Sequence, residues 1–376
     1  MLSAGYLNQQ GVVDNNEYNR LSIRSNIDHK FNDRVSAGMR IALTRSNDSS
    51  YGTAGKSDAV SLAVQSAPIF PVSVETGSLG FKDPDSMWNT FVKYGFQQWH
   101  PYALTREMSK KKTTDMVLIN SFLDFKIFDD LTFRTAFSAD VGDVNYISYW
   151  NAGQDWGYSG WVPAEANFNT MRSTNWVWEN TLNYNKTFGT DHTVTGLAGY
   201  TMQEQVLENS DMKAGSFPND LVHTLNAGKV NKGSTLEADW SLLSVIARAT
   251  YSYKGKYLTS AALRADGSSR FGKNNRWGYF PSASAAWRIS EEDFMQDMSY
   301  LNNLKLRLSY GVTGNNLVND YASIALLAYS PYVQNGTTEN GLYTSTMSDP
   351  SLKWEKTGQT NLGLDASFFN SRVNLT

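Results

Sequence analysis

The segment NLKLRLSYGVT, residues 303–313, alternates apolar and polar side chains without a break. Leucine, tyrosine and valine occupy the even positions, whereas lysine, arginine, serine, glycine and threonine follow at the odd ones. Successive side chains of a β-strand point to opposite faces, so this pattern gives one strand an apolar face and a polar face. The same alternation recurs in residues 131–141, 243–253 and 354–368. The sequence therefore predicts an all-β fold.

Segments in which apolar residues recur at every second position give about thirteen predicted strands. Most are roughly 10–16 residues long, whereas strands of soluble proteins average about 5–6 and a tilted membrane-spanning strand needs about 9–11. The predicted spans are residues 1–11, 18–31, 34–47, 112–128, 131–143, 173–187, 191–206, 239–254, 256–266, 277–289, 303–313, 353–369 and 372 onward.

The connections between these strands alternate in length. Tight turns are expected at residues 32–33, 129–130, 188–190, 254–256 and 370–371. Long loops are expected at residues 48–111, 144–172, 207–238, 267–276 and 314–352. Aromatic residues stand near both sets of strand ends, as Trp277 and Trp287 do. The pattern indicates an antiparallel up-and-down transmembrane β-barrel with short periplasmic turns and long extracellular loops.

Composition narrows the classes of function. The chain has 376 residues, 13% aromatic and 18% charged, with a net charge of −3, which argues against a nucleic-acid binder. There is no cysteine, so thiol catalysis and cysteine-ligated metals are excluded. The four histidines are scattered, and no catalytic motif is present. We expect no catalytic residue, no metal site, no cofactor and no enzyme activity.

An odd strand count is unusual for a bacterial barrel, and an open sheet edge cannot lie in hydrocarbon. The last predicted strand also stops after a few residues. We therefore expect residues 1–376 to be a single barrel domain that is part of a larger barrel, truncated at both ends and without a plug domain.

Three quoted runs carry a resemblance to a known family. They are LRADGSSRFGKNNRWGYFPSASAAWRISEEDFM at 263–295, LNNLKLRLSYGVTGNN at 301–316 and DPSLKWEKTGQTNLGLDASFFNSRVNLT at 349–376. Together they resemble the barrel of the SusC/RagA-type TonB-dependent transporters, which are outer-membrane proteins of Bacteroidetes. The resemblance implies import of oligosaccharides, or of peptides in some members. It also implies a SusD-like surface lipoprotein as partner, and energy from the TonB complex through an N-terminal part that is missing from this segment.

The candidate ligand contacts lie in the loop YWNAGQDWGYSGWVP, residues 149–163. Aromatic faces beside amide and carboxylate groups suit sugar rings, which stack and accept hydrogen bonds. An alternative is that these side chains pack the loop on itself or on a lid protein. Residues 87–102 have a similar composition and the same two interpretations. The predicted contacts are Trp150, Trp156, Tyr158 and Trp161.

A second set of candidate residues is basic. Arg264, Arg288, Lys305 and Arg307 have the parity opposite the apolar residues of their strands, so we expect them to face the barrel lumen. They could guide a substrate, or they could pair with carboxylates of the lumen or the plug, which is the interpretation we prefer. The 267–276 tip between two of these strands lacks the order of a phosphate-binding loop and is interpreted as a hairpin end.

Two alternatives to an energised importer remain open. One is a passive porin or structural barrel of the outer membrane, in contact with its lipid. The other is a soluble β-rich module that binds carbohydrate.

Overall fold

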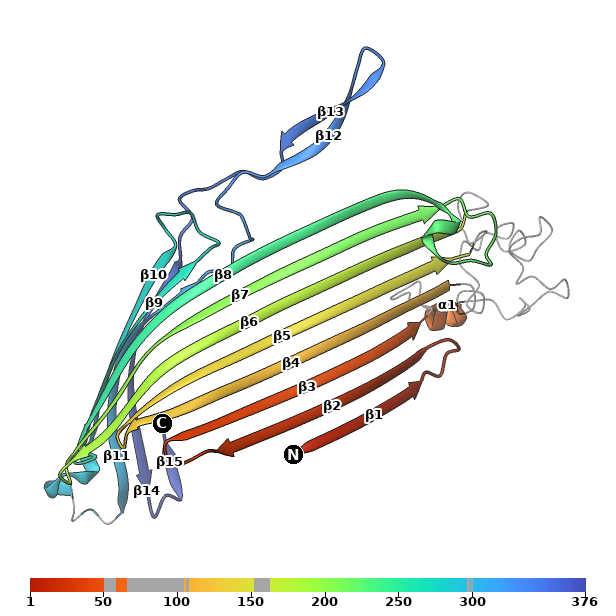
Figure 1. Ribbon diagram of the computed structural model, residues 1–376. Helices are drawn as coiled ribbons and strands as arrows, with labels where there is room; N and C mark the ends of the chain where they lie inside the picture. Colours follow the sequence, from red (N-terminus) through yellow and green to blue (C-terminus); the bar gives the residue numbers. More distant parts are fainter. Residues whose placement is uncertain (51–58, 66–104, 106–107, 152–162, 296–297, 299) are drawn as a thin grey trace.

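The computed structural model describes residues 1–50, 59–65, 105, 108–151, 163–295, 298 and 300–376. Within these ranges thirteen strands form one antiparallel sheet, in the order β1 to β11, then β14 and β15 (Figure 1). The first seven are β1 (Leu2–Gln10), β2 (Glu17–Lys30), β3 (Val35–Ser50), β4 (Met108–Phe128), β5 (Leu131–Trp150), β6 (Glu165–Phe188) and β7 (His192–Gly215). The other six are β8 (Lys229–Tyr253), β9 (Tyr257–Ser268), β10 (Trp277–Arg288), β11 (Leu301–Asn315), β14 (Glu355–Phe368) and β15 (Val373–Leu375).

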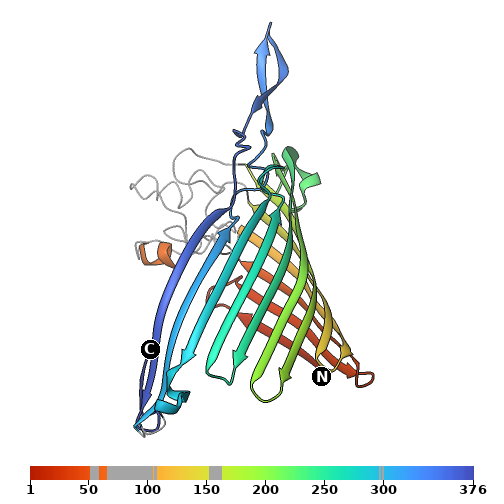
Figure 2. The same cartoon turned by 90° about the vertical axis from the view of Figure 1, so that its left-hand side faces the viewer.

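The sheet confirms the predicted all-β, up-and-down architecture. Each strand pairs with its neighbour in the chain, apart from the step from β11 to β14, and the sheet curves as part of a barrel wall (Figures 1 and 2). Strands β1 and β15 lie at the two edges, so the wall is not closed by the described residues. Trp277 begins β10 and Trp287 stands near its other end, as predicted.

Several strands are longer than the sequence predicted. β8 has 25 residues, and β6 and β7 have 24 each. At about 3.3 Å per residue β8 is roughly 80 Å long, whereas about 9–11 tilted residues cross the hydrocarbon core. The extra length lies at the end opposite the short turns, where the partners of β7 and β8 continue to Gly215 and Lys229. Outside the bilayer nothing requires one face to be apolar, so alternation did not reveal these extensions.

A second correction concerns the expected loop at residues 314–352. It contains two more strands, β12 (Leu327–Gln334) and β13 (Thr337–Thr344), which pair with each other and stand apart from the main sheet. They meet at Asn335-Gly336, where both φ angles are positive, 52° and 81°. Asn-Gly is the preferred pair for such a two-residue turn, so this dipeptide could have indicated the hairpin, but residues 314–352 were expected to be a loop.

Short helices occupy a few connections. They are α1 (Ala59–Gln65), η2 (Leu225–Ala227), η3 (Ile289–Glu291) and η4 (Asp293–Met295). None of the helices in the described ranges is long and apolar enough to cross a bilayer.

The register separates the two faces of the sheet. On β11 and β14, Leu308 pairs with Leu362 and Leu306 with Leu364, and all four side chains are exposed on one face. Arg307 and Asp365 belong to the opposite, polar face and form an ion pair. An exposed apolar face is what contact with lipid requires.

Buried apolar residues gather in small clusters near the outer strand ends. One cluster joins Phe271, Phe280 and Trp354. Another forms around Tyr149, which is 1% exposed and stacks on His223. In these clusters, side chains of the outer loops pack against side chains of the sheet, and this packing positions the candidate site.

Candidate functional site

The four predicted basic residues share one face of the sheet. Arg288 pairs directly with Lys305 across β10 and β11, and Arg307 lies two positions further along β11. Arg264 on β9 pairs with Phe280 of β10, which has the same parity as Arg288. The alternation seen in the sequence therefore assigned all four to the polar face.

Two of these side chains form ion pairs, and two do not in the described ranges. Arg264 donates from Nε to both carboxylate oxygens of Asp266, at 2.7 and 2.9 Å. Arg307 donates from Nη2 to Asp365 at 2.7 Å. Arg288 and Lys305 form no ion pair among the described residues, although Lys305 pairs in register with Asp365 on its other side. Like charges placed opposite each other are unfavourable, so this part of the face is suited to an anionic partner.

The predicted aromatic loop is covered in part by the structure. Trp150 ends β5, and its ring packs against a buried cluster of Ala59, Leu62 and Met108. The other three candidates and residues 87–102 lie outside the described residues, so their contact with a ligand stays a prediction. The three candidates are Trp156, Tyr158 and Trp161.

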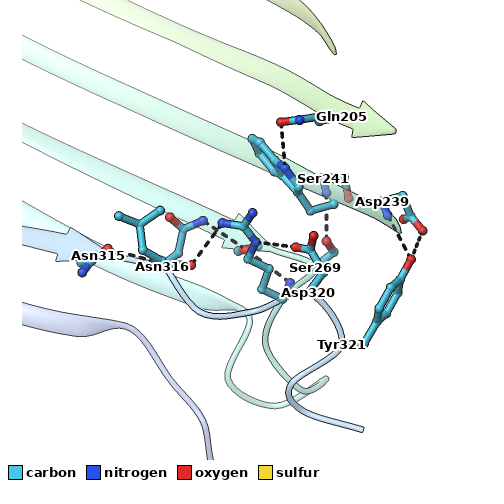
Figure 3. A network of polar contacts seen from close by, with 12 residues as sticks. Gln205, Asp239, Ser241, Ser269, Asn315, Asn316, Asp320 and Tyr321 are labelled. Carbon is cyan, nitrogen blue, oxygen red and sulfur yellow. Dashed lines mark hydrogen bonds and ion pairs between the residues drawn. The ribbon is translucent and has the colours of Figure 1, made fainter. Parts of the chain in front are cut away.

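A polar network that sequence reasoning missed lies at the outer rim (Figure 3). Its centre is Arg270, in the tip that joins β9 to β10. The guanidinium donates from Nε to Asp320 at 2.7 Å and from Nη1 to the carbonyl of Asn316 at 3.4 Å. It also lies 4.8 Å from the centre of the Trp240 ring, a cation–π arrangement. The side chains of Arg270 and Asp320 are only 15% and 26% exposed, so solvent screens this ion pair less than a surface one.

Further contacts tie the same loop to β8 and β9. Ser268 is fully buried, and its Oγ accepts a hydrogen bond from Asn316 Nδ2 at 3.3 Å. The Tyr321 hydroxyl accepts from the Asp239 amide at 3.0 Å and donates to the Asp239 carboxylate (Figure 3). That bond raises the pKa of the Tyr321 hydroxyl. Tyr321 has a φ of 62°, a conformation unfavourable for a bulky residue, which the two hydrogen bonds hold in place.

Apolar packing beneath the network completes the rim. Phe280 is 7% exposed and meets Trp354 edge to face, with 5.2 Å between ring centres. Trp354 Nε1 donates to the carbonyl of Arg276 at 2.8 Å. The pairing of β10 with β11 ends at Ser282, and beyond it the Phe280 ring lies where a Cβ on Gly314 would stand. We call this whole assembly the rim socket. It consists of Trp240, Ser268–Arg270 and Asn316–Tyr321, with Phe280 and Trp354 packed beneath them.

The charged and polar side chains at these two places, the polar face and the rim socket, are groups that bind and position other molecules or loops. Among the described residues no group of His, Cys, Asp or Glu could hold a metal ion. The arginines of the polar face and of the rim can bind anionic or hydroxyl-rich groups, and the rim socket can position a loop.

Comparison with known proteins agrees with this geometry. The sequence model described as "TonB dependent receptor-like, beta-barrel" matches residues 43–376. A TonB-dependent receptor of Formosa agariphila is 32% identical over all of this chain and 34% of its own length. The TonB-dependent receptor SusC of Bacteroides thetaiotaomicron is 27% identical over 99% of the chain and 38% of its own.

Among solved structures, that of the RagAB peptide transporter matches 99% of this chain and 41% of its own, with a TM-score of 0.78 and 22% identity. This likeness shows the fold. The chain spans about a third of the length of the curated relatives it matches. The thirteen-stranded wall therefore lies in the outer membrane, and the chain belongs to the TonB-dependent receptor-like β-barrel family.

Proposed function

We propose that the chain is the barrel part of an energised outer-membrane importer that takes up oligosaccharides, with peptides as the second substrate class. The observation that carries the proposal is the curved antiparallel sheet with one apolar and one polar face, in a chain of this receptor family. The apolar face contacts lipid. The polar face, with Arg264, Arg288, Lys305 and Arg307, lines the passage.

Substrate class rests on the resemblance and on the aromatic loop. In the sequence, Trp150 and the three candidates beyond it alternate with amide and carboxylate residues, a composition that suits sugar rings. Peptides are supported by the fold likeness to a peptide transporter. We also propose that the basic residues of this face pair with carboxylates of the lumen, as Arg264 and Arg307 do, or with carboxylates of a plug where the described wall offers none, as at Arg288.

The partners in this proposal are a SusD-like surface lipoprotein and, through another part of the parent protein, the TonB complex. Residues 1–376 are then one domain within a larger barrel. No catalytic step is assigned to it.

Uptake by the full-length receptor tests the proposal. Labelled oligosaccharides and peptides are offered to cells that carry or lack TonB. Uptake of one class that disappears without TonB is expected. Uptake that persists without TonB would instead identify a passive porin.

A further inference from the structure

The hairpin β12–β13 projects beyond the outer ends of the main sheet, away from the membrane-spanning part (Figures 1 and 2). Only one charged residue, Glu339, occurs in residues 321–348. A two-stranded hairpin on its own is marginally stable in water. A hairpin with a single charged residue in this position therefore gains stability from a surface that covers it.

The two faces of the hairpin differ. Register places Tyr329 opposite Leu342 and Val333 opposite Thr338. Val333 and Leu342 are 73% and 70% exposed. The opposite face carries Tyr332 beside Glu339. The other face, which we call the arm face, carries the larger apolar set: Leu327, Tyr329, Pro331, Val333 and Leu342, with Thr338, Asn340 and Thr344 between them.

The root of the hairpin is fixed on both sides. Before it, Asp320 and Tyr321 are held in the rim socket. Where the hairpin begins and ends, the Ser345 amide donates to the carbonyl of Leu326 at 2.8 Å. After it, the carbonyl of Pro350 accepts from Asn275 Nδ2 at 3.1 Å. The arm face is therefore carried on an anchored base.

We propose that the hairpin is a docking arm for the protein that covers the outer opening of the barrel, and that the rim socket positions it. The inference rests on the proposed function, which supplies that protein as a SusD-like lipoprotein. The arm face makes the contact, and Arg270 acts as a positioning residue through Asp320.

The location, charge and size of the hairpin together indicate that the partner of the arm face is a protein. The arm stands beyond the strand ends, so bilayer lipid is out of its reach. It has no basic residue between Tyr321 and Ser348, so it does not complement a phosphorylated glycolipid. Tyrosine with few charges is typical of the centre of a protein interface. A standard interface uses about 20–30 residues on each side, and the hairpin with its flanks, residues 321–348, supplies a set of that size.

The test measures binding of the full-length receptor to the SusD-like lipoprotein of the proposed function, prepared without its lipid anchor and labelled with a fluorophore. The first variant is Tyr329→Ser with Leu342→Ser, on the arm face. The matched control is Tyr332→Ser with Tyr343→Ser, on the opposite face. We expect at least a 10-fold weaker Kd for the arm-face variant and less than a 3-fold change for the control.

Two further variants separate contact from positioning. Residues 327–344 are replaced by Asn-Gly, which the adjacent Leu326 and Ser345 allow, and binding should fall as far as in the arm-face variant. Asp320→Asn leaves the arm intact but removes its ion pair with Arg270, so a smaller loss, about 3- to 10-fold, is expected. Insertion into the outer membrane, followed by heat-modifiable migration in gels, is measured for every variant.

The outcomes distinguish failure of the docking-arm proposal from failure of the proposed function. Unchanged binding by the arm-face and deletion variants overturns the arm while TonB-dependent uptake still stands. A photo-crosslinker at position 342 that captures a second receptor copy or lipopolysaccharide, instead of the lipoprotein, also overturns it. Uptake that persists without TonB removes the proposed function, whereas loss of binding in the variants still supports the arm.

Discussion

Replacing Gly314 by alanine should destabilise the outer rim although the change adds one methyl group. A Cβ at this position would stand 2.1 Å from Cζ and 2.2 Å from Cε1 of Phe280. Carbon atoms in contact are about 3.5–4.0 Å apart, so the overlap exceeds about 1 Å. The ring has little room to move because it is 7% exposed and packed against Trp354. Overpacking of this kind costs about 1–3 kcal/mol, and removing a strand glycine returns only about 0.5–1 kcal/mol.

The measurement is urea unfolding of the full-length receptor in lipid vesicles, followed by heat-modifiable gel migration. Gly311→Ala is the matched control on the same strand, because its Cβ would meet only Ser282 Cβ at 3.4 Å. Because both variants gain the same benefit from losing a strand glycine, we expect Gly314→Ala to lose about 1–3 kcal/mol relative to this control. Phe280→Leu in the Gly314→Ala background should restore part of the loss. If both alanine variants unfold at the same urea concentration, Phe280 does not occupy the space assigned to it.

Three further changes test other parts of the molecule. Leu308→Arg on the apolar face should cost about 2–4 kcal/mol in vesicles, whereas Ser309→Arg on the polar face should cost far less; equal losses would reverse the face assignment. Tyr321→Phe should cost about 1 kcal/mol of loop anchoring, seen as faster proteolysis within 316–352. Because the pKa of Tyr321 is raised, its contribution is present below about pH 10 and is lost as pH rises through the raised pKa, so unchanged proteolysis at high pH would contradict it. Asp365→Asn should cost under about 1 kcal/mol, since its ion pair with Arg307 is partly exposed; a larger loss in a double-mutant cycle would contradict this.

The rim socket gives the 263–280 run a structural role. Ser268 lies at the end of β9 and Arg270 in the 267–276 tip, and both are engaged by the loop that follows β11. The tip is a hairpin end, as predicted, and Arg270 forms an ion pair with Asp320. The sequence contained all of these residues, but nothing in their spacing linked position 270 to position 320.

The alternation of apolar and polar side chains along the sequence was enough to predict most strands of the sheet and the face to which their side chains belong. Whether a residue faces lipid or the polar side depends on its parity within a strand, which is a local property. For this reason the thirteen strands of the sheet, the lipid-facing leucines around Leu308 and the common face of Arg264, Arg288, Lys305 and Arg307 could all be predicted from the sequence.

Only the tertiary structure decided the outer rim. Beyond the bilayer no face has to be apolar, so the periodic signal ends and the extra length of β6, β7 and β8 could not be predicted. The hairpin β12–β13 lies within a segment that was expected to be a loop. Its Asn335-Gly336 turn is a local feature of the sequence, but the separation of the hairpin from the main sheet is not. The contacts of Arg270 with Asp320 and of Asp239 with Tyr321 join residues far apart in the chain. Such contacts depend on where strands end and how loops cross, and these are set by the register of the whole sheet.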